Sequence, residues 1–261
     1  MKRVSILMYH GLYRNELELK SIDAEDRPYA LSTREFQAQL SLLQKHGVPV
    51  LDPTALECGH LEQGGVIITF DDGHSSNAEL AMPLLRDHAM KAAFFITTGF
   101  IGQRPGYCSW EQVRELAANG MLVGGHGHTH CFLSDVSNEV LRRELQTSQA
   151  QLAQALQRPA IQMSFPGGRF DAQSIAAARA AGFAVMHGSA VGTLTVQAEM
   201  SGRPVPRIAI RPGMTHPIFM AYAQGRATRM VRAQLASQLK GMVKRLIGNE
   251  RYHQLYARLK G

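Results

Sequence analysis

The sequence lacks the features that mark disulfide-bonded, zinc-ribbon or membrane-spanning proteins. Only three of its 261 residues are cysteines, Cys58, Cys108 and Cys131, and no two of them form a CxxC pair. Buried free thiols are therefore expected rather than a disulfide framework. No apolar run approaches the ~18 residues that a membrane span needs, and the run after Lys2 and Arg3 is too short for a signal-peptide core. These absences predict a globular, cytoplasmic protein.

Motifs for several hydrolase and oxygenase chemistries are missing as well. There is no GxSxG, and none of the cysteines has a recognisable nucleophile setting. A non-haem iron oxygenase would also use two histidines and a carboxylate, but its usual His-x-Asp spacing is absent. Serine, cysteine and iron-oxygenase mechanisms are therefore disfavoured.

The net charge of +7 is concentrated at the C-terminal end. Residues 221–261 contain nine Lys or Arg residues against Glu250 alone, a net +8 that leaves −1 for residues 1–220. Most of the chain therefore gives no electrostatic reason to expect nucleic acid as a partner. On a helical wheel the apolar and basic residues of the 216–261 tail lie on different sides. This amphipathic tail is expected either to pack on the rest of the protein or to contact an anionic membrane peripherally, at its inner face.

Apolar strand-like runs alternate with helical segments along most of the chain. The runs lie at 4–9, 66–70, 92–96 and 121–123, and shorter ones end at Phe165, Met186 and Ile210. Strict alternation predicts an α/β fold with a parallel sheet, closed or nearly closed into a barrel. No linker is evident before about residue 212, so 1–215 is expected to form one domain and 216–261 the helical tail.

Capping signals mark the expected helices between these runs. Ser32 and Ser109 each stand three residues before a Glu or Gln, and Asp171 can cap the Ala-rich segment that follows it. Three glycines stand where helices are expected to end: Gly47, Gly120 and Gly182.

Polar or glycine-rich clusters follow four of the apolar runs. His10 follows the first, Asp71 and Asp72 follow 66–70, GGHGHTH at 124–130 follows 121–123, and the segment 165–168 ends another. In a parallel α/β protein catalytic groups gather at the carboxyl ends of the strands. We therefore expect these clusters to meet at one edge of the sheet.

The acidic pair and the histidine cluster together favour a metal site. Two adjacent carboxylates after a buried strand are unfavourable unless a cation or a proton relieves them, although a solvated turn is the alternative. His126 and His130 are four residues apart and can bind one metal ion on a helical turn, whereas an extended segment would also align His128. Two histidines and an aspartate suit catalytic Zn²⁺ or a similar divalent ion such as Co²⁺, Ni²⁺ or Fe²⁺. Surface histidines on a loop remain the other interpretation.

These motifs resemble those of a known enzyme family. TFDDG at 69–73, followed by His126-x-x-x-His130 and Leu133, is similar to the first two signature motifs of the NodB-like polysaccharide deacetylases, carbohydrate esterase family 4. The resemblance spans about residues 3–211. It implies a distorted (β/α)₇ barrel with a metal-dependent amide hydrolase site. By this match Asp71 is the general base, and the metal ligands are Asp72, His126 and His130.

The sequence departs from the family pattern at two motifs. Ser164 occupies the place of an arginine that normally precedes Pro-x-Gly, and three arginines are candidates for replacing it: Arg169, Arg207 and Arg211. The late Leu-x-x-His motif that carries the catalytic acid is absent. Met8-Tyr9-His10 resembles a subgroup with permuted motifs, which includes biofilm poly-N-acetylglucosamine deacetylases and has an early histidine as the acid. His10 is therefore the candidate acid, against the alternatives of a buried structural histidine and of His74 as the acid.

The resemblance implies hydrolysis of an N-acetyl group on an amino sugar in a glycan or lipid-linked saccharide. Substrate binding is assigned to four residues: Tyr9, Phe165, Pro166 and Gly167. A catalytically degenerate barrel that binds a glycan or nucleic acid is the alternative, and the removed group could also be formyl.

Overall fold

The centre of the molecule is a curled sheet of parallel strands. A computed structural model describes residues 2–58, 61–196 and 202–226. The strands run in the order β10-β1-β4-β5-β6-β7-β8. Their bounds are β1 (Arg3–Tyr9), β4 (Gly65–Phe70), β5 (Ala92–Ile96), β6 (Leu122–Gly125), β7 (Gln162–Ser164), β8 (Val185–His187) and β10 (Ile208–Ala209). The expected parallel α/β architecture is confirmed, and a short strand β9 (Leu194–Thr195) adds antiparallel to β1.

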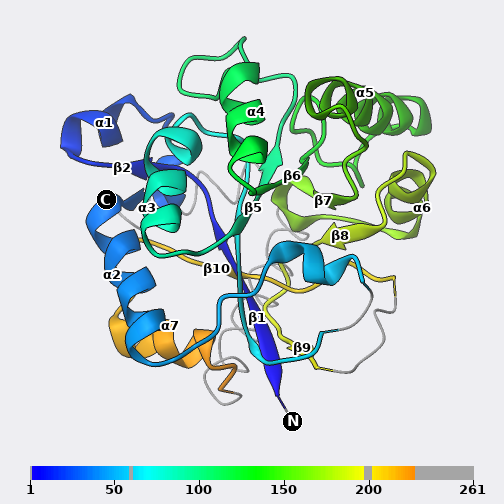
Figure 1. The fold of residues 1–261 in the computed structure, drawn as a ribbon. Coiled ribbons are helices and arrows are strands. Elements are labelled where there is room, and N and C mark those ends of the chain that lie inside the picture. The colour runs from blue at the N-terminus through cyan, green and yellow to red at the C-terminus, as the bar shows by residue number, and fades with distance from the viewer. Residues whose placement is uncertain (1, 59–60, 197–201, 227–261) are drawn as a thin grey trace, which may run out of the picture.

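Helices surround this sheet roughly in chain order (Figure 1). They are α2 (Thr33–Lys45), α3 (Met82–Asp87), α4 (Trp110–Ala118), α5 (Asn138–Leu156) and α6 (Ala172–Ala180). Both predicted capping boxes are present, at the start of α2 and of α4, and Asp171 caps α6. The three predicted helix-ending glycines all have positive φ, as such positions require.

The segment before β10 brings the two ends of the sheet together. His187 in β8 forms an isolated parallel bridge with Val205, and the Gly188 amide donates to the Val205 carbonyl at 2.9 Å. Three residues further on, Ile208 pairs with Leu7 of β1. Residues 205–209 therefore connect β8 to β1, and the sheet is nearly closed into a barrel.

Side chains alternate between the barrel interior and the helix layer, as strand geometry requires. Ile6 and Ile67 belong to an interior cluster with Val185. Tyr9 and Phe70 belong instead to the large cluster that includes Phe36 of α2. Because the period is two, the residues that follow Tyr9 and Phe70, namely His10 and Asp71, turn toward the interior at the carboxyl end of the strands.

One part of the fold was not expected from the sequence. Between β1 and α2 the chain forms α1 (Glu16–Ser21), a 3-10 turn η1 (Arg27–Tyr29) and a separate two-stranded sheet of β2 (Leu12–Tyr13) with β3 (Leu31–Ser32). The remaining short elements are η2 (Pro53–Leu56), a π-helical turn η3 (Asn77–Ala81) and η4 (Pro166–Gly168). The segment between β1 and α2 lies at the carboxyl end of β1, where its Tyr29 contacts His10.

The packed structure extends beyond residue 215. Helix α7 (His216–Ala223) buries Phe219 and lies against α2 and β1, where Ser5 donates to the Tyr222 carbonyl at 2.6 Å. The first part of the predicted tail thus packs on the barrel, while the predicted amphipathic helix beyond residue 226 lies outside the described residues. Among the described residues, no helix is both long and apolar enough to cross a membrane.

The cysteines differ from one another in burial. Cys108 is buried, but Cys58 is exposed and Cys131 is only partly buried. The expectation that the cysteines are buried is therefore wrong for Cys58.

Candidate active site

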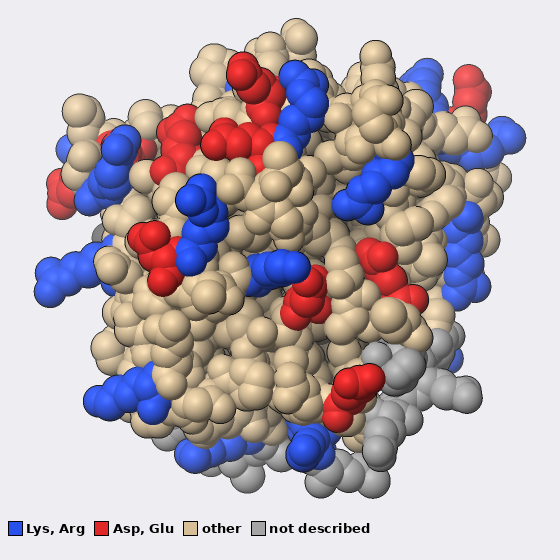
Figure 2. All heavy atoms as spheres, viewed as in Figure 1, with Lys and Arg blue, Asp and Glu red and all other residues tan. Residues whose placement is uncertain are grey.

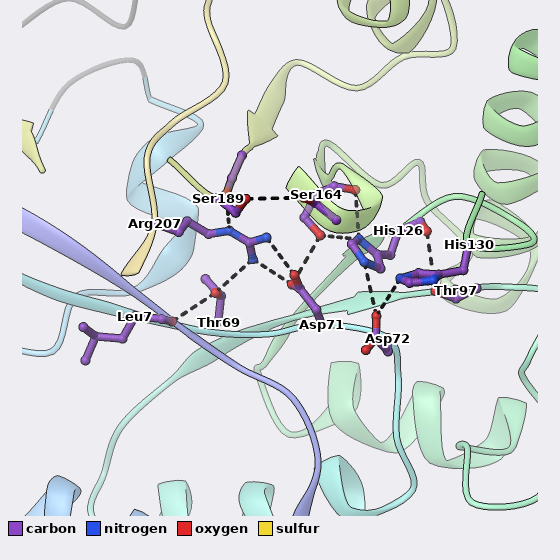
Figure 3. A network of polar contacts seen from close by, with 12 residues as sticks. Leu7, Thr69, Asp71, Asp72, Thr97, His126, His130, Ser164, Ser189 and Arg207 are labelled. Carbon is purple, nitrogen blue, oxygen red and sulfur yellow. Dashed lines mark hydrogen bonds and ion pairs between the residues drawn. The ribbon is translucent and has the colours of Figure 1, made fainter. Parts of the chain in front are cut away.

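The predicted metal ligands meet at the carboxyl end of the barrel. Oδ1 of Asp72 lies 3.2 Å from Nε2 of His126 and 3.2 Å from Nε2 of His130 (Figure 3). Two ligand atoms that are each about 2.1 Å from one ion in a tetrahedral site lie about 3.4 Å apart. Among the described residues, this same Asp72 oxygen is buried without a hydrogen-bond partner. The three side chains therefore fit a shared divalent cation.

A hydrogen bond fixes the ring of His126 in the orientation that metal binding needs. Nδ1 of His126 lies 2.9 Å from the Ser164 carbonyl oxygen, to which it donates, so Nε2 keeps its lone pair toward Asp72. The Ser164 hydroxyl also contacts this nitrogen and donates to Oδ1 of Asp71 at 3.2 Å. Ser164 thus contacts both the metal ligand and the predicted base.

A buried carboxylate holds the loop that carries His130. Oε2 of Glu144, on α5, accepts from the backbone amides of His128 and Thr129, both at 2.8 Å, and Oε1 accepts from the Thr129 hydroxyl at 2.8 Å. Gly127 and His130 both have positive φ within this loop. His128 points away from the ligand set, to the Thr98 hydroxyl at 3.0 Å. In the structure His126 and His130, rather than His128, are therefore grouped with Asp72.

Arg207 takes the place of the missing motif arginine. Its two terminal nitrogens donate to the two oxygens of Asp71, each at 2.7 Å, and Nε donates to the Gly188 carbonyl at 2.8 Å. Burial would raise the pKa of Asp71, but the charge and hydrogen bonds of Arg207, together with the charges of His126 and His10, outweigh burial and lower this pKa below its usual range. Of the other candidates, Arg169 pairs with Asp135 and Arg211 stacks on Tyr29. Asp71 is thus held ionised beside the metal ligands.

His10 lies at the same edge, within electrostatic range of both aspartates. Burial would raise the pKa of Asp71 and of Asp72, but neighbouring groups, among them the charge of His10, outweigh burial and hold both pKa values below their usual range. Within the described chain, Nδ1 of His10 is buried and has no hydrogen-bond partner, so the alternative of a histidine satisfied by a backbone carbonyl is not supported. The rival His74 is engaged elsewhere, with Nδ1 2.9 Å from the Ser76 hydroxyl.

The predicted substrate-binding residues are only partly available to a ligand. Tyr9 is 2% exposed and its hydroxyl donates to Gln39 at 2.8 Å, so the prediction for its side chain is wrong. The reason is strand alternation, which turns Tyr9 into the helix layer. Phe165 and Pro166 are also buried, which contradicts a role for their side chains, whereas Gly167 is exposed.

Two contributors were not assigned from the sequence. Arg207 was one of three open candidates, and no motif identified Glu144. The sequence does contain a signal for Glu144, because its spacing places it on the same buried face of α5 as Leu141, Leu145 and Ser148. A carboxylate on the apolar side of a helix needs an internal hydrogen-bonding partner.

Comparisons with known proteins agree with the fold and with the family resemblance. Residues 59–186 match the family model for polysaccharide deacetylase. The protein YxkH of Bacillus subtilis (strain 168), named as a polysaccharide deacetylase, is 24% identical over 85% of this chain and 76% of its own length. A chitooligosaccharide deacetylase of Rhizobium leguminosarum bv. trifolii is 28% identical over 48% of this chain and 56% of its own. The Streptococcus pyogenes deacetylase PplD superposes with a TM-score of 0.73 at 22% identity, covering 85% of this chain and 98% of that one.

Proposed function

Because the chain belongs to the polysaccharide deacetylase family, we propose that it hydrolyses the N-acetyl amide of an amino sugar in a glycan or lipid-linked saccharide. The observation that carries the proposal is the convergence of Asp72, His126 and His130 beside the Asp71–Arg207 pair. The similarity to a chitooligosaccharide deacetylase supports an N-acetylated saccharide as substrate.

Zn²⁺ is the first candidate for the cation, with Co²⁺, Ni²⁺ and Fe²⁺ as alternatives. Two imidazole nitrogens and one carboxylate oxygen suit Zn²⁺ with a free position for water. A divalent ion held there would supply Lewis acidity, which lowers the pKa of a bound water strongly and polarises the amide carbonyl.

The remaining steps belong to side chains of this chain. Asp71, ionised by its pairing with Arg207, accepts a proton from the attacking water. As the carbon–nitrogen bond breaks, His10 donates a proton to the departing nitrogen, giving acetate and a free amine. The base thus acts on the attacking water, and the acid acts on the leaving amine.

Paired variants test these roles. Hydrolysis of tetra-N-acetylchitotetraose should be abolished by a chelator and restored by Zn²⁺ or Co²⁺. Asp72→Ala and His126→Ala should lose metal and turnover together, whereas His10→Ala should keep metal and lose turnover. His128→Ala is the matched control, since its side chain points to Thr98, and it should remain active. A His10 variant with normal metal content and wild-type turnover would overturn the acid assignment.

The alternative of a degenerate, non-catalytic barrel loses its main support. It rested on the missing arginine at position 164 and on the absent late histidine motif. Arg207 supplies a guanidinium to Asp71 from the segment before β10, and His10 is the candidate for the missing acid. Among the described residues in view, acidic and basic side chains are interspersed (Figure 2), which does not favour nucleic acid as a partner. Salt-dependent nucleic-acid binding without sugar hydrolysis would restore this alternative.

We also propose a cytoplasmic location with peripheral contact to anionic lipid through the tail. Support comes from the sequence, where basic residues dominate 221–261. Co-sedimentation with vesicles containing phosphatidylglycerol, compared for the full chain and a variant ending at Arg226, tests it. Equal pelleting of the two would remove the membrane part of the proposal.

A further inference from the structure

The candidate acid His10 is held in an unusual way. Its backbone carbonyl accepts from the buried side chain of Asn77 at 3.0 Å, which fixes the main chain. Its ring nitrogen Nδ1, however, is buried without a hydrogen-bond partner among the described residues. Catalytic histidines are commonly oriented by a hydrogen bond to a carboxylate or carbonyl. In this structure no such bond to Nδ1 sets the plane of the imidazole.

A tyrosine from residues 12–32, the segment between β1 and α2 that we call the β2–β3 excursion, contacts that ring instead. The ring centroids of Tyr29 and His10 are 4.9 Å apart with 34° between the planes. Beside Tyr29, the guanidinium carbon of Arg211 lies 4.9 Å from the tyrosine centroid. Both distances lie within the range over which aromatic pairs and cation–π pairs are in contact. The three side chains form a contact series from Arg211 through Tyr29 to His10.

Hydrogen bonds of the main chain and of one side chain keep the members of this series in place. The Leu31 amide, two residues after Tyr29, donates to the Gly11 carbonyl at 3.0 Å, next to His10. Asp26, which precedes η1, accepts from the Tyr107 hydroxyl at 2.7 Å. Arg211 follows β10, and the Ile210 amide donates to the Met8 carbonyl of β1 at 2.9 Å. Three separate segments are thus fixed to one another around the imidazole.

We propose that Tyr29 is a positioning residue for His10, holding the imidazole by ring contact, and that Arg211 holds Tyr29. The inference rests on the proposed function, in which His10 protonates the leaving amine. General acids contribute about 10²–10⁴-fold to a rate. If the imidazole is held less firmly, part of this rate enhancement should be lost, while metal binding stays unchanged.

The test uses the full zinc-loaded chain with two substrates. Tetra-N-acetylchitotetraose has an amine leaving group that needs a proton, whereas 4-nitrophenyl acetate has a phenolate leaving group that does not. Tyr29→Leu should lower kcat on the amide about tenfold or more, with KM within about twofold and zinc content unchanged. Hydrolysis of the ester should stay close to wild type. Tyr29→Phe should behave as wild type, because the contact does not use the hydroxyl.

Further variants separate positioning from a general structural effect. Arg211→Met should show a smaller loss on the amide, of about threefold. Tyr13→Leu, a partly buried tyrosine of the same excursion, is the matched control and should be unaffected. In a His10→Ala background, Tyr29→Leu should cause no further loss.

Three results would overturn the inference: an undiminished kcat for Tyr29→Leu, a raised KM with unchanged kcat, or a full additional loss in the His10→Ala background. Failure of the proposed acid role is distinguishable from these. In that case His10→Ala itself would hydrolyse the amide at the wild-type rate, whatever Tyr29→Leu did.

Discussion

Replacing Arg207 by methionine isolates the buried ion pair that keeps the predicted base ionised. The side chains of Arg207 and Asp71 are 1% and 4% exposed, and two hydrogen bonds of 2.7 Å join them. Methionine keeps much of the side-chain length but removes every donor. Breaking a buried pair by removing one partner typically costs about 3–5 kcal/mol, because the other charge stays buried. We therefore expect Arg207→Met to lower the free energy of unfolding by about that amount at pH 7.

The loss should depend on pH in a defined direction. In the native protein burial would raise the pKa of Asp71, but this pKa is lowered because Arg207, with smaller contributions from His126 and His10, outweighs the effect of burial. A lowered folded-state pKa contributes stability above the unfolded value of about 3.9, and this contribution is lost as pH falls through the folded value. In the variant, burial acts without Arg207 and raises the pKa of Asp71, so protonation relieves the buried charge. The difference between wild type and variant should shrink from pH 7 to pH 4.

Urea unfolding followed by circular dichroism measures both effects, with chelator present so that metal binding does not contribute. The double variant Asp71→Asn, Arg207→Met removes both charges and is the control; it should be more stable than Arg207→Met alone. In activity assays, the acid limb of kcat/KM for Arg207→Met should move to higher pH. The reasoning is refuted if Arg207→Met costs less than about 1 kcal/mol at pH 7, or if its cost is the same at pH 4.

The other predictions concern the metal loop and its surroundings. Glu144→Gln places an amide group among the donors of residues 128 and 129, so zinc affinity measured by chelator competition should fall about 10–100-fold; unchanged affinity in a folded variant would contradict this. Zn²⁺ should raise the Tm of the wild type with the logarithm of its concentration above Kd, and should leave the Tm of Asp72→Ala unmoved; an equal shift in both would place the metal elsewhere. A Cβ on Gly168 would lie 1.8 Å from the Ser189 hydroxyl at a φ of +65°, so Gly168→Ala should lose about 1–3 kcal/mol in urea unfolding, and a neutral effect would refute the predicted clash.

The sequence was sufficient for the parts of the site that local rules determine. Alternation along β1 and β4 turns His10 and Asp71 toward the barrel interior, because it depends only on neighbouring residues. The helical turn predicted for His126 and His130 is absent, since their segment is a loop in which Gly127 and His130 have positive φ, although both imidazoles still meet Asp72. The same alternation explains the wrong prediction for Tyr9. It was assigned to the site through its motif, although its neighbour His10 must then face the opposite way.

Contacts that depend on closure of the barrel could not be predicted. Arg207 lies 136 positions from Asp71, and the two meet only because residues 205–209 join β8 to β1. Sequence spacing carries no information on that closure, so Arg169, Arg207 and Arg211 were equivalent candidates. The β2–β3 excursion was missed for a different reason, because two-residue strands are too short to show a periodic pattern.

The arginine that normally precedes Pro-x-Gly is therefore replaced by an arginine elsewhere in the barrel. Ser164 is fully buried on β7, with its carbonyl bound to His126 and its hydroxyl bound to Asp71. A serine there maintains both contacts, while the guanidinium reaches the same carboxylate from the segment beside β10. Because the interior is closely packed, a second arginine at position 164 would compete with Arg207 for one buried carboxylate. Serine at 164 and arginine at 207 thus form one interdependent arrangement, which explains how the base stays ionised without the usual motif.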